Sequence, residues 1–177
     1  GDTVGAVEMA VECAVDDRLR ARLTAESAMA WLIAGDFANA RQAAAVGSKR
    51  GEAIGDIVTV LAAEMVGCLV AFYDHDVPEA RRLADRLETL ADLPEAAEAA
   101  IYQPWFAASL IHLELHDHDR CVRLNATGRA RALATGHLWM VPAYDALDAY
   151  SAWERGEFDD AVANATAALA WNLNDTF

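Results

Sequence analysis

The 177-residue sequence predicts an all-α fold, a right-handed solenoid of about four antiparallel helical hairpins. Three observations support this fold class. Four short turns recur at a nearly constant spacing, and small residues recur at fixed offsets from them. The apolar residues between the turns follow a helical period, and no stretch shows the sustained alternation of a β-strand. A fixed period of about 40 residues indicates stacked units of supersecondary structure.

The four turns divide the chain into units of similar length. Their first residues are Gly35, His75, His116 and Gly156, so the successive steps measure 40, 41 and 40 residues. A glycine here can take the left-handed conformation in which helices often end. The next residue is an acid in every turn, and its carboxylate can accept a free amide of the following helix as an N-cap. Each turn is therefore expected to join two helices.

Glycine, proline and apolar spacing define the expected helices in order. Gly51 and Gly136 mark helix ends, and Pro142 marks a first helical turn. Asp92 is expected to cap the helix that opens the third full unit, and Pro104 is expected to kink that helix. By residue number, the expected helices are 1–15, 18–34, 37–49, 52–73, 78–90, 93–115, 120–134, 142–155 and 158–173.

The helices are expected to form one repeat domain over residues 1–177. The opening stretch reads as the second helix of a unit whose start is missing, and we therefore expect a fragment of a larger protein. The units are a partial one at 1–15, followed by 18–50, 52–91, 94–135 and 138–173.

Three columns of small residues appear when the units are aligned on their turns. Small side chains at these columns would let the two helices of a hairpin approach closely, because a large side chain would hold the axes apart. In order along the chain, the columns are Ala28, Cys68, Ser109 and Ala149; Ala40, Ala80, Cys121 and Ala161; and Ala44, Ala84, Asn125 and Ala165.

Composition narrows the possible functions. A net charge of −14 argues against binding of a nucleic-acid backbone by this segment, which would need clustered Lys and Arg. No uninterrupted apolar run reaches the length of a membrane span, and the longest candidate, residues 57–73, is broken by Thr59, Glu64 and Gly67. The three cysteines have no paired spacing, so we expect a reduced, cytoplasmic setting.

The turns and small columns resemble those of the tetratricopeptide superfamily of helical hairpins. Its standard unit has 34 residues, so each unit here would be about six residues longer. The stretch 153–161, followed by 167–170, looks like the repeat region of large ATP-dependent LuxR-type bacterial regulators similar to the maltose-regulon activator. In such regulators a nucleotide-binding module precedes the repeats and a helix-turn-helix follows them. This sequence contains neither a phosphate-binding loop motif nor a basic recognition helix.

The resemblance also implies an inner face on the first helix of each unit. Most residues at the corresponding positions are apolar, and methionine would make such a face adaptable to a partner helix, an apolar peptide or a small hydrophobic inducer. The alternative is that tight curvature or a neighbouring subunit buries the same residues as core. The candidate binding residues are Met29, Met65, Leu69, Phe72, Tyr73, Phe106, Leu110, Tyr150 and Trp153.

A histidine cluster gives a weaker candidate site. His112 and His116 lie one helical turn apart, and with His118 they could hold zinc or nickel. The alternative is a polar turn in which His112 packs against a neighbouring helix. Cys68 and Cys121 occupy small-residue columns, where a thiol acts as a small apolar group, so no catalytic centre and no cofactor are expected.

The expected function is a ligand- or protein-binding regulatory scaffold of a bacterial LuxR-type transcriptional activator, with possible homodimerisation. It would act by a ligand-dependent change in helix packing or self-association, relayed to modules outside this chain. A free-standing adaptor for protein assembly is the alternative. A third class, a metal-dependent enzyme built on the histidine cluster, is the least favoured.

Overall fold

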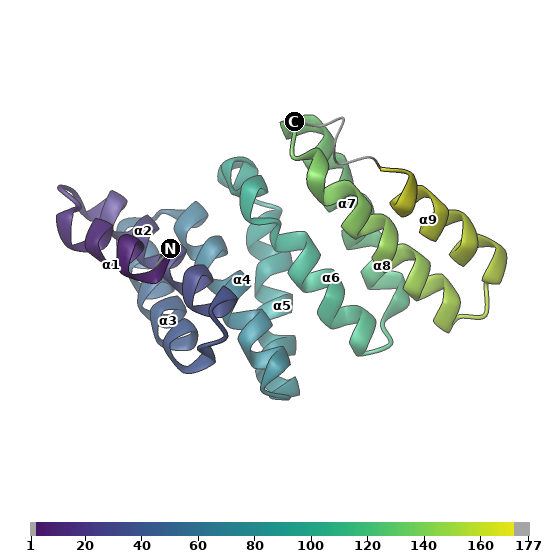
Figure 1. The fold of residues 1–177 in the computed structure, drawn as a ribbon, viewed down its shortest axis with the longest axis horizontal. Coiled ribbons are helices and arrows are strands. Elements are labelled where there is room, and N and C mark those ends of the chain that lie inside the picture. The colour runs from purple at the N-terminus through teal and green to yellow at the C-terminus, as the bar shows by residue number, and fades with distance from the viewer. Residues whose placement is uncertain (1–2, 172–177) are drawn as a thin grey trace.

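The computed structural model describes residues 3–171, and within this range the chain is all-helical, without β-strands (Figure 1). None of its helices is both long and apolar enough to span a bilayer. In chain order the elements are α1 (Thr3–Cys13), α2 (Asp17–Ile33), α3 (Phe37–Ile54), α4 (Ile57–Tyr73), α5 (Val77–Ala91), the 3₁₀ helix η1 (Pro94–Tyr102), α6 (Pro104–Glu114), α7 (His118–Thr135), the 3₁₀ turn η2 (Leu138–Met140), α8 (Val141–Glu154) and α9 (Phe158–Ala170).

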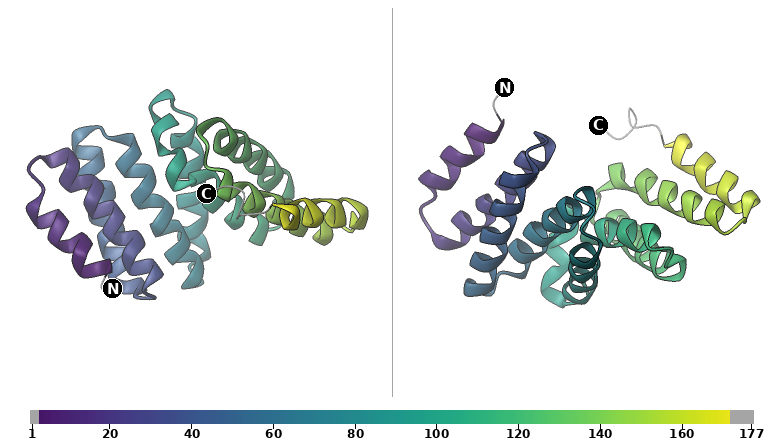
Figure 2. Two further views of the ribbon diagram at one scale, coloured as in Figure 1. Left: turned by 45° about the horizontal axis from the view of Figure 1, so that its top comes forward. Right: turned by 90° about the horizontal axis from the view of Figure 1, so that it is seen from below.

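The helices follow one another along the molecule in chain order, from α1 at one end to α9 at the other (Figures 1 and 2). Each α-helix packs against its neighbour in the sequence, and alternate helices also meet, α2 with α4, α4 with α6 and α6 with α8. α4 is therefore enclosed by several elements. This explains why α4 is apolar around most of its circumference.

The four repeated turns have one backbone geometry. Gly35, His75, His116 and Gly156 all adopt left-handed φ values, between 57° and 78°. In each turn the next residue donates its N–H to the carbonyl five residues earlier, at 2.8–3.0 Å, which is the Schellman arrangement at a helix C-terminus. The predicted turns are thus confirmed, including the two in which histidine replaces glycine.

Three of the four acids after these turns cap the next helix. The carboxylates of Asp36, Asp76 and Asp117 each accept the backbone N–H three residues further along, at 3.1–3.3 Å. Glu157, the N-cap residue of α9 at the fourth turn, makes no such bond among the described residues. The N-cap prediction therefore holds for aspartate, whose short side chain reaches the amide.

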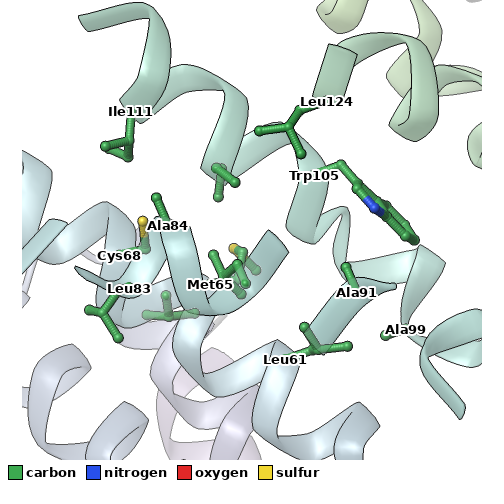
Figure 3. Close-up of a cluster of buried hydrophobic side chains, with 14 of the residues drawn as sticks. Leu61, Met65, Cys68, Leu83, Ala84, Ala91, Ala99, Trp105, Ile111 and Leu124 are labelled. Atoms are coloured by element: carbon green, nitrogen blue, oxygen red, sulfur yellow. The ribbon is translucent and has the colours of Figure 1, made fainter. Parts of the chain in front are cut away.

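The core joins α4, α5, η1, α6 and α7 (Figure 3). Leu61 and Met65 of α4 contribute to it together with Leu87 of α5 and Trp105 of α6, all at most 5% exposed. The small-column residues of the first three turns are all buried, in keeping with the predicted close approach of the helices.

Two predicted helix boundaries were wrong. Gly51 does not end α3, because a helical backbone there lets it pack against Val60, where an added Cβ would lie 2.9 Å from Val60 Cγ2. The helix continues to Ile54 and ends at Gly55, which has a φ of 67°. Asp92 closes α5 instead of opening a new α-helix.

The third unit differs most from the prediction. The segment Pro94–Tyr102 forms a 3₁₀ helix, Gln103 turns the backbone into the left-handed region, and α6 begins at Pro104. Pro104 therefore starts a helix and does not kink one, since a first-turn amide needs no intrahelical partner. The predicted last helix extends to residue 173, and its two final positions lie outside the described range.

The packing between α6, α7 and α8 is polar where the preceding packing is alanine-rich. Ser109 Oγ lies 2.5 Å from Asn125 Oδ1 and 2.9 Å from the carbonyl oxygen of Cys121. Its single proton can be donated to either acceptor. Asn125 Nδ2 donates to Asp148 Oδ1 at 2.8 Å. Tyr144 is fully buried and donates its hydroxyl to Gln103 Oε1 at 2.8 Å.

Asp56 links α2 to the start of α4. Its buried carboxylate accepts hydrogen bonds from Arg18, Arg22 and Thr59, at 2.5–3.2 Å. Burial alone would raise the pKa of Asp56, but these three donors outweigh it and lower the pKa to about 2.

Candidate functional site

The residues expected on an apolar inner face fall into three classes of exposure. Met65 is 5% exposed and belongs to the core, so it is not available to a partner as predicted. Tyr73, Tyr150 and Trp153 are exposed. The remaining five are partly buried against the core clusters: Met29, Leu69, Phe72, Phe106 and Leu110.

The three exposed residues of the predicted set lie at two separate places. Tyr73 stacks on Phe37 of α3, with ring centroids 5.5 Å apart and planes 5° from parallel, and Phe72 lies beside it. Tyr150 stacks on Trp153 of α8, with centroids 5.6 Å apart and planes at 20°. The second pair belongs to a larger apolar surface.

This surface, the α8–α9 groove, encloses about 580 Å³. Trp153 is 56% exposed and Phe158, at the start of α9, is 63% exposed, which is unusual for large apolar side chains in one cluster. Every lining side chain is alanine, aliphatic or aromatic: Ala146, Ala149, Tyr150, Trp153, Phe158, Ala161, Val162, Ala165, Ala168 and Leu169.

The α8–α9 groove corresponds to surfaces that are covered in the earlier units. It contains the last member of each small column, Ala149, Ala161 and Ala165, and all three are only partly buried. The nine earlier members are buried. Among the helices of residues 3–171, α8 alone makes extensive contact with α9, and α9 has no buried residue.

The structure separates the three candidate metal-binding histidines. His112 is 1% exposed, and burial, followed by the charge of Arg120, lowers its pKa. His116 and His118 lie instead beside Glu154, the last residue of α8. The prediction that His112 packs against neighbouring helices is confirmed, and the set His112–His116–His118 is wrong as a metal site because His112 points into the core.

A third candidate is a groove of about 600 Å³ between α3, α4 and α5, called the Glu64 groove below. Its walls carry charges of both signs, and its floor is made of small or apolar residues of α4 with Leu83 of α5. The lining residues are Arg41, Ala44, Ala45, Ser48, Lys49, Glu52, Ala63, Glu64, Gly67, Ala71, Asp76, Glu79, Arg82, Leu83 and Arg86.

Glu64 is the buried acid of this groove, with its side chain 6% exposed. Its Oε1 accepts a hydrogen bond from Ser48 Oγ at 2.9 Å and forms an ion pair with Arg86 Nε at 2.9 Å. Its Oε2 is buried and has no hydrogen-bond partner among the described residues. Burial raises the pKa of Glu64 despite the hydrogen bond from Ser48 and the charge of Arg86. A half-satisfied carboxylate in a hollow can accept a hydrogen bond from a ligand.

The two buried cysteines do not suggest a nucleophile. Cys68 and Cys121 are buried, and burial raises the pKa of Cys68 to about 12. Cys121 has a raised pKa for the same main reason. A thiol with a raised pKa is poorly ionised at neutral pH and reacts slowly.

Sequence reasoning missed Glu64 and Glu154 as functional candidates. Glu64 is the single acid inside the apolar stretch 57–73, and that isolation was the available signal. Glu154 stands two residues before a repeated turn, so an alignment of the four units could have placed it near the preceding turn.

No protein-family model matches the sequence, and neither does any curated protein. The resemblance to a repeat family therefore stays a prediction based on the turns and columns alone.

Proposed function

We propose that the chain is a regulatory scaffold built as a right-handed solenoid of tetratricopeptide-like hairpins, and that its α8–α9 groove binds an apolar helix of a protein partner. The single observation that supports this binding most strongly is the α8–α9 groove itself. Its small-column residues are buried in every earlier unit and open only here.

The earlier units indicate what kind of element fits the groove. α4 packs against α2 and α3 of the first full unit, and α6 packs against α4 and α5 of the second. In both cases the packing helix is apolar, and the small-column residues of the hairpin before it are buried. An apolar helix laid in a groove is also a common mode of protein recognition.

Charge further defines the partner. Four acids flank Trp153 and Phe158 in the sequence, namely Glu154, Glu157, Asp159 and Asp160. Of these, Glu157 is already paired with Arg155, at 2.6 Å. A partner helix with an apolar face and basic ends would therefore meet complementary charge, which speeds encounter and favours one orientation.

Binding can be measured with a labelled peptide that carries residues 57–73, the sequence of α4, with three added lysines at each end. We expect saturable binding by fluorescence anisotropy. Trp153→Ala should weaken it at least tenfold, because a tryptophan that becomes buried in an interface is a frequent hot spot. Trp139→Ala is the matched control, since Trp139 is 49% exposed and lies outside the groove.

Three results would contradict the proposal. One is the absence of saturable binding, and another is equal binding of a scrambled peptide. The third is a homodimer in native mass spectrometry that Trp153→Ala dissociates, which would make a second copy of this chain the occupant of the groove.

The regulatory context rests on the resemblance to LuxR-type bacterial activators. In that context, partner binding at the last hairpin would change helix packing and be relayed to modules outside this chain. A full-length gene with a phosphate-binding loop before this segment and a helix-turn-helix after it would support the proposal, and a gene that encodes only repeats would favour a free-standing adaptor.

The unpartnered Glu64 Oε2 favours a second candidate function, binding of a small inducer in the Glu64 groove. The ligand would donate an ammonium or amide N–H to Glu64 and lay an apolar body on the floor of the groove. A panel of primary alkylamines tests this by thermal shift. Stabilisation should be lost in Glu64→Gln and kept in Glu79→Gln, because Glu79 lies on the wall and pairs with Arg82. No stabilisation by any amine, or an equal loss in both variants, would exclude it.

A further inference from the structure

We propose that His116, His118 and Glu154 form a binding site for a divalent transition-metal ion such as Zn²⁺. The histidines come from the turn between α6 and α7 and from the first residue of α7, and Glu154 is the last residue of α8. One ligand atom from each lies within 4.8 Å of the other two. Two imidazoles and a carboxylate are a ligand set that suits zinc.

The distance from Glu154 to His116 fits two ligands on one ion, and the distance from Glu154 to His118 is slightly longer. Glu154 Oε2 lies 3.3 Å from His116 Nδ1 and 3.7 Å from His118 Nε2. In a tetrahedral zinc site with bonds of about 2.0–2.1 Å, two ligand atoms are roughly 3.3–3.4 Å apart. The second distance is too long for a hydrogen bond, so His118 Nε2 faces the carboxylate without being bonded to it.

The other ring nitrogen of His118 is already engaged. His118 Nδ1 lies 3.2 Å from Ser151 Oγ, one turn before Glu154 on α8. With Nδ1 donating to Ser151, Nε2 carries the lone pair and points at the Glu154 carboxylate. Metal-binding histidines usually donate their other N–H in this manner, which fixes the tautomer and the ring orientation.

The exposure of the three side chains is that expected for a metal site that is accessible and partly preformed. The side chains of His118 and Glu154 are 18% and 17% exposed, so the packing of α7 on α8 holds them, while His116 is 73% exposed and can swing onto an ion. The remaining coordination position would face solvent and take a water molecule.

The preceding turn provides an internal comparison. His75 and Glu114 occupy the positions equivalent to His116 and Glu154, and Val77 occupies the position equivalent to His118. All three line one small hollow between α4, α5 and α6. This second place has two of the three ligands, so it lacks only the imidazole that the proposed site gains from His118.

Calorimetric titration of the tag-free protein with Zn²⁺ tests the proposal, with Co²⁺ absorption as a report of tetrahedral coordination. We expect one ion per chain, and at least tenfold weaker binding in His118→Val and in Glu154→Gln. His75→Ala should bind like the wild type. Val77→His should bind a second ion, because it completes the equivalent set.

Circular dichroism and the melting temperature of each variant, measured without metal, separate lost binding from lost folding. The proposal is overturned if the wild type binds no stoichiometric ion, if folded His118→Val binds as tightly as the wild type, or if His75→Ala loses the ion.

Discussion

Replacing Gly128 with alanine should destabilise the protein strongly, although alanine is the better helix former. Gly128 lies inside α7, and an added Cβ would stand 2.4 Å from Tyr144 Oη and 2.5 Å from Tyr144 Cζ. Tyr144 is fully buried and cannot move away without losing its hydrogen bond to Gln103, which is itself buried.

The size of the effect follows from three contributions. Overpacking costs about 1–3 kcal/mol, and two buried polar groups left without each other cost about 1–3 kcal/mol more. The helix propensity of alanine returns about 1 kcal/mol. We expect a net loss of about 1–5 kcal/mol in the free energy of unfolding, and each kcal/mol lowers the melting temperature by roughly 3 °C in a domain of this size.

The matched control is Gly67→Ala in α4. An added Cβ there would lie 3.5 Å from Leu83 Cδ1, an ordinary contact, so the propensity gain should stabilise the protein by about 0.5–1 kcal/mol. Urea unfolding followed by circular dichroism measures both variants under the same conditions. Effects of the same sign at the two positions would refute the reasoning, because it predicts opposite signs for one and the same substitution.

Three further outcomes are expected. Asp56→Asn should lose about 1–2 kcal/mol of stability at pH 7, since a shift of the carboxyl pKa from 3.8 to about 2 is worth roughly 2 kcal/mol before solvent screens the exposed arginines. A lowered carboxyl pKa stabilises above pH 4, so chemical unfolding should show this difference shrinking as the pH falls from 4 towards 2; a constant difference would contradict the assignment. Glu64→Gln should gain stability relative to the wild type as the pH rises from 4 to 8, because the raised pKa of Glu64 makes its ionisation unfavourable in the folded state; a pH-independent difference between the two unfolding curves would argue against this. A thiol reagent should label Cys13 rapidly in the native protein and Cys68 and Cys121 only after unfolding, and rapid labelling of all three thiols would show that the core is open.

Much of the fold was predictable because its signals are local. The left-handed turn residues, the aspartate caps and the small columns depend on residues within one hairpin, and the structure reproduces them. The end of α3 was not predictable in this way. Gly51 and Gly55 are equally good local stop signals, and only the packing of Gly51 on Val60, from the next unit, decides between them.

The candidate site was predictable only where it lies on one helix. Tyr150 and Trp153 share a face of α8 and were expected together. Met65 was misassigned because its exposure depends on how closely α5 and α6 enclose α4, which no single helix encodes. Glu154 is 38 residues from His116, and their proximity follows from the packing of α8 against α6 and α7.

The polar packing around Asn125 has a mechanical consequence. Alanine against alanine offers much the same contact when one helix slides along another, whereas Ser109, Asn125 and Asp148 satisfy one another in a single alignment only. A load applied to α9 should therefore turn α6, α7 and α8 as one body.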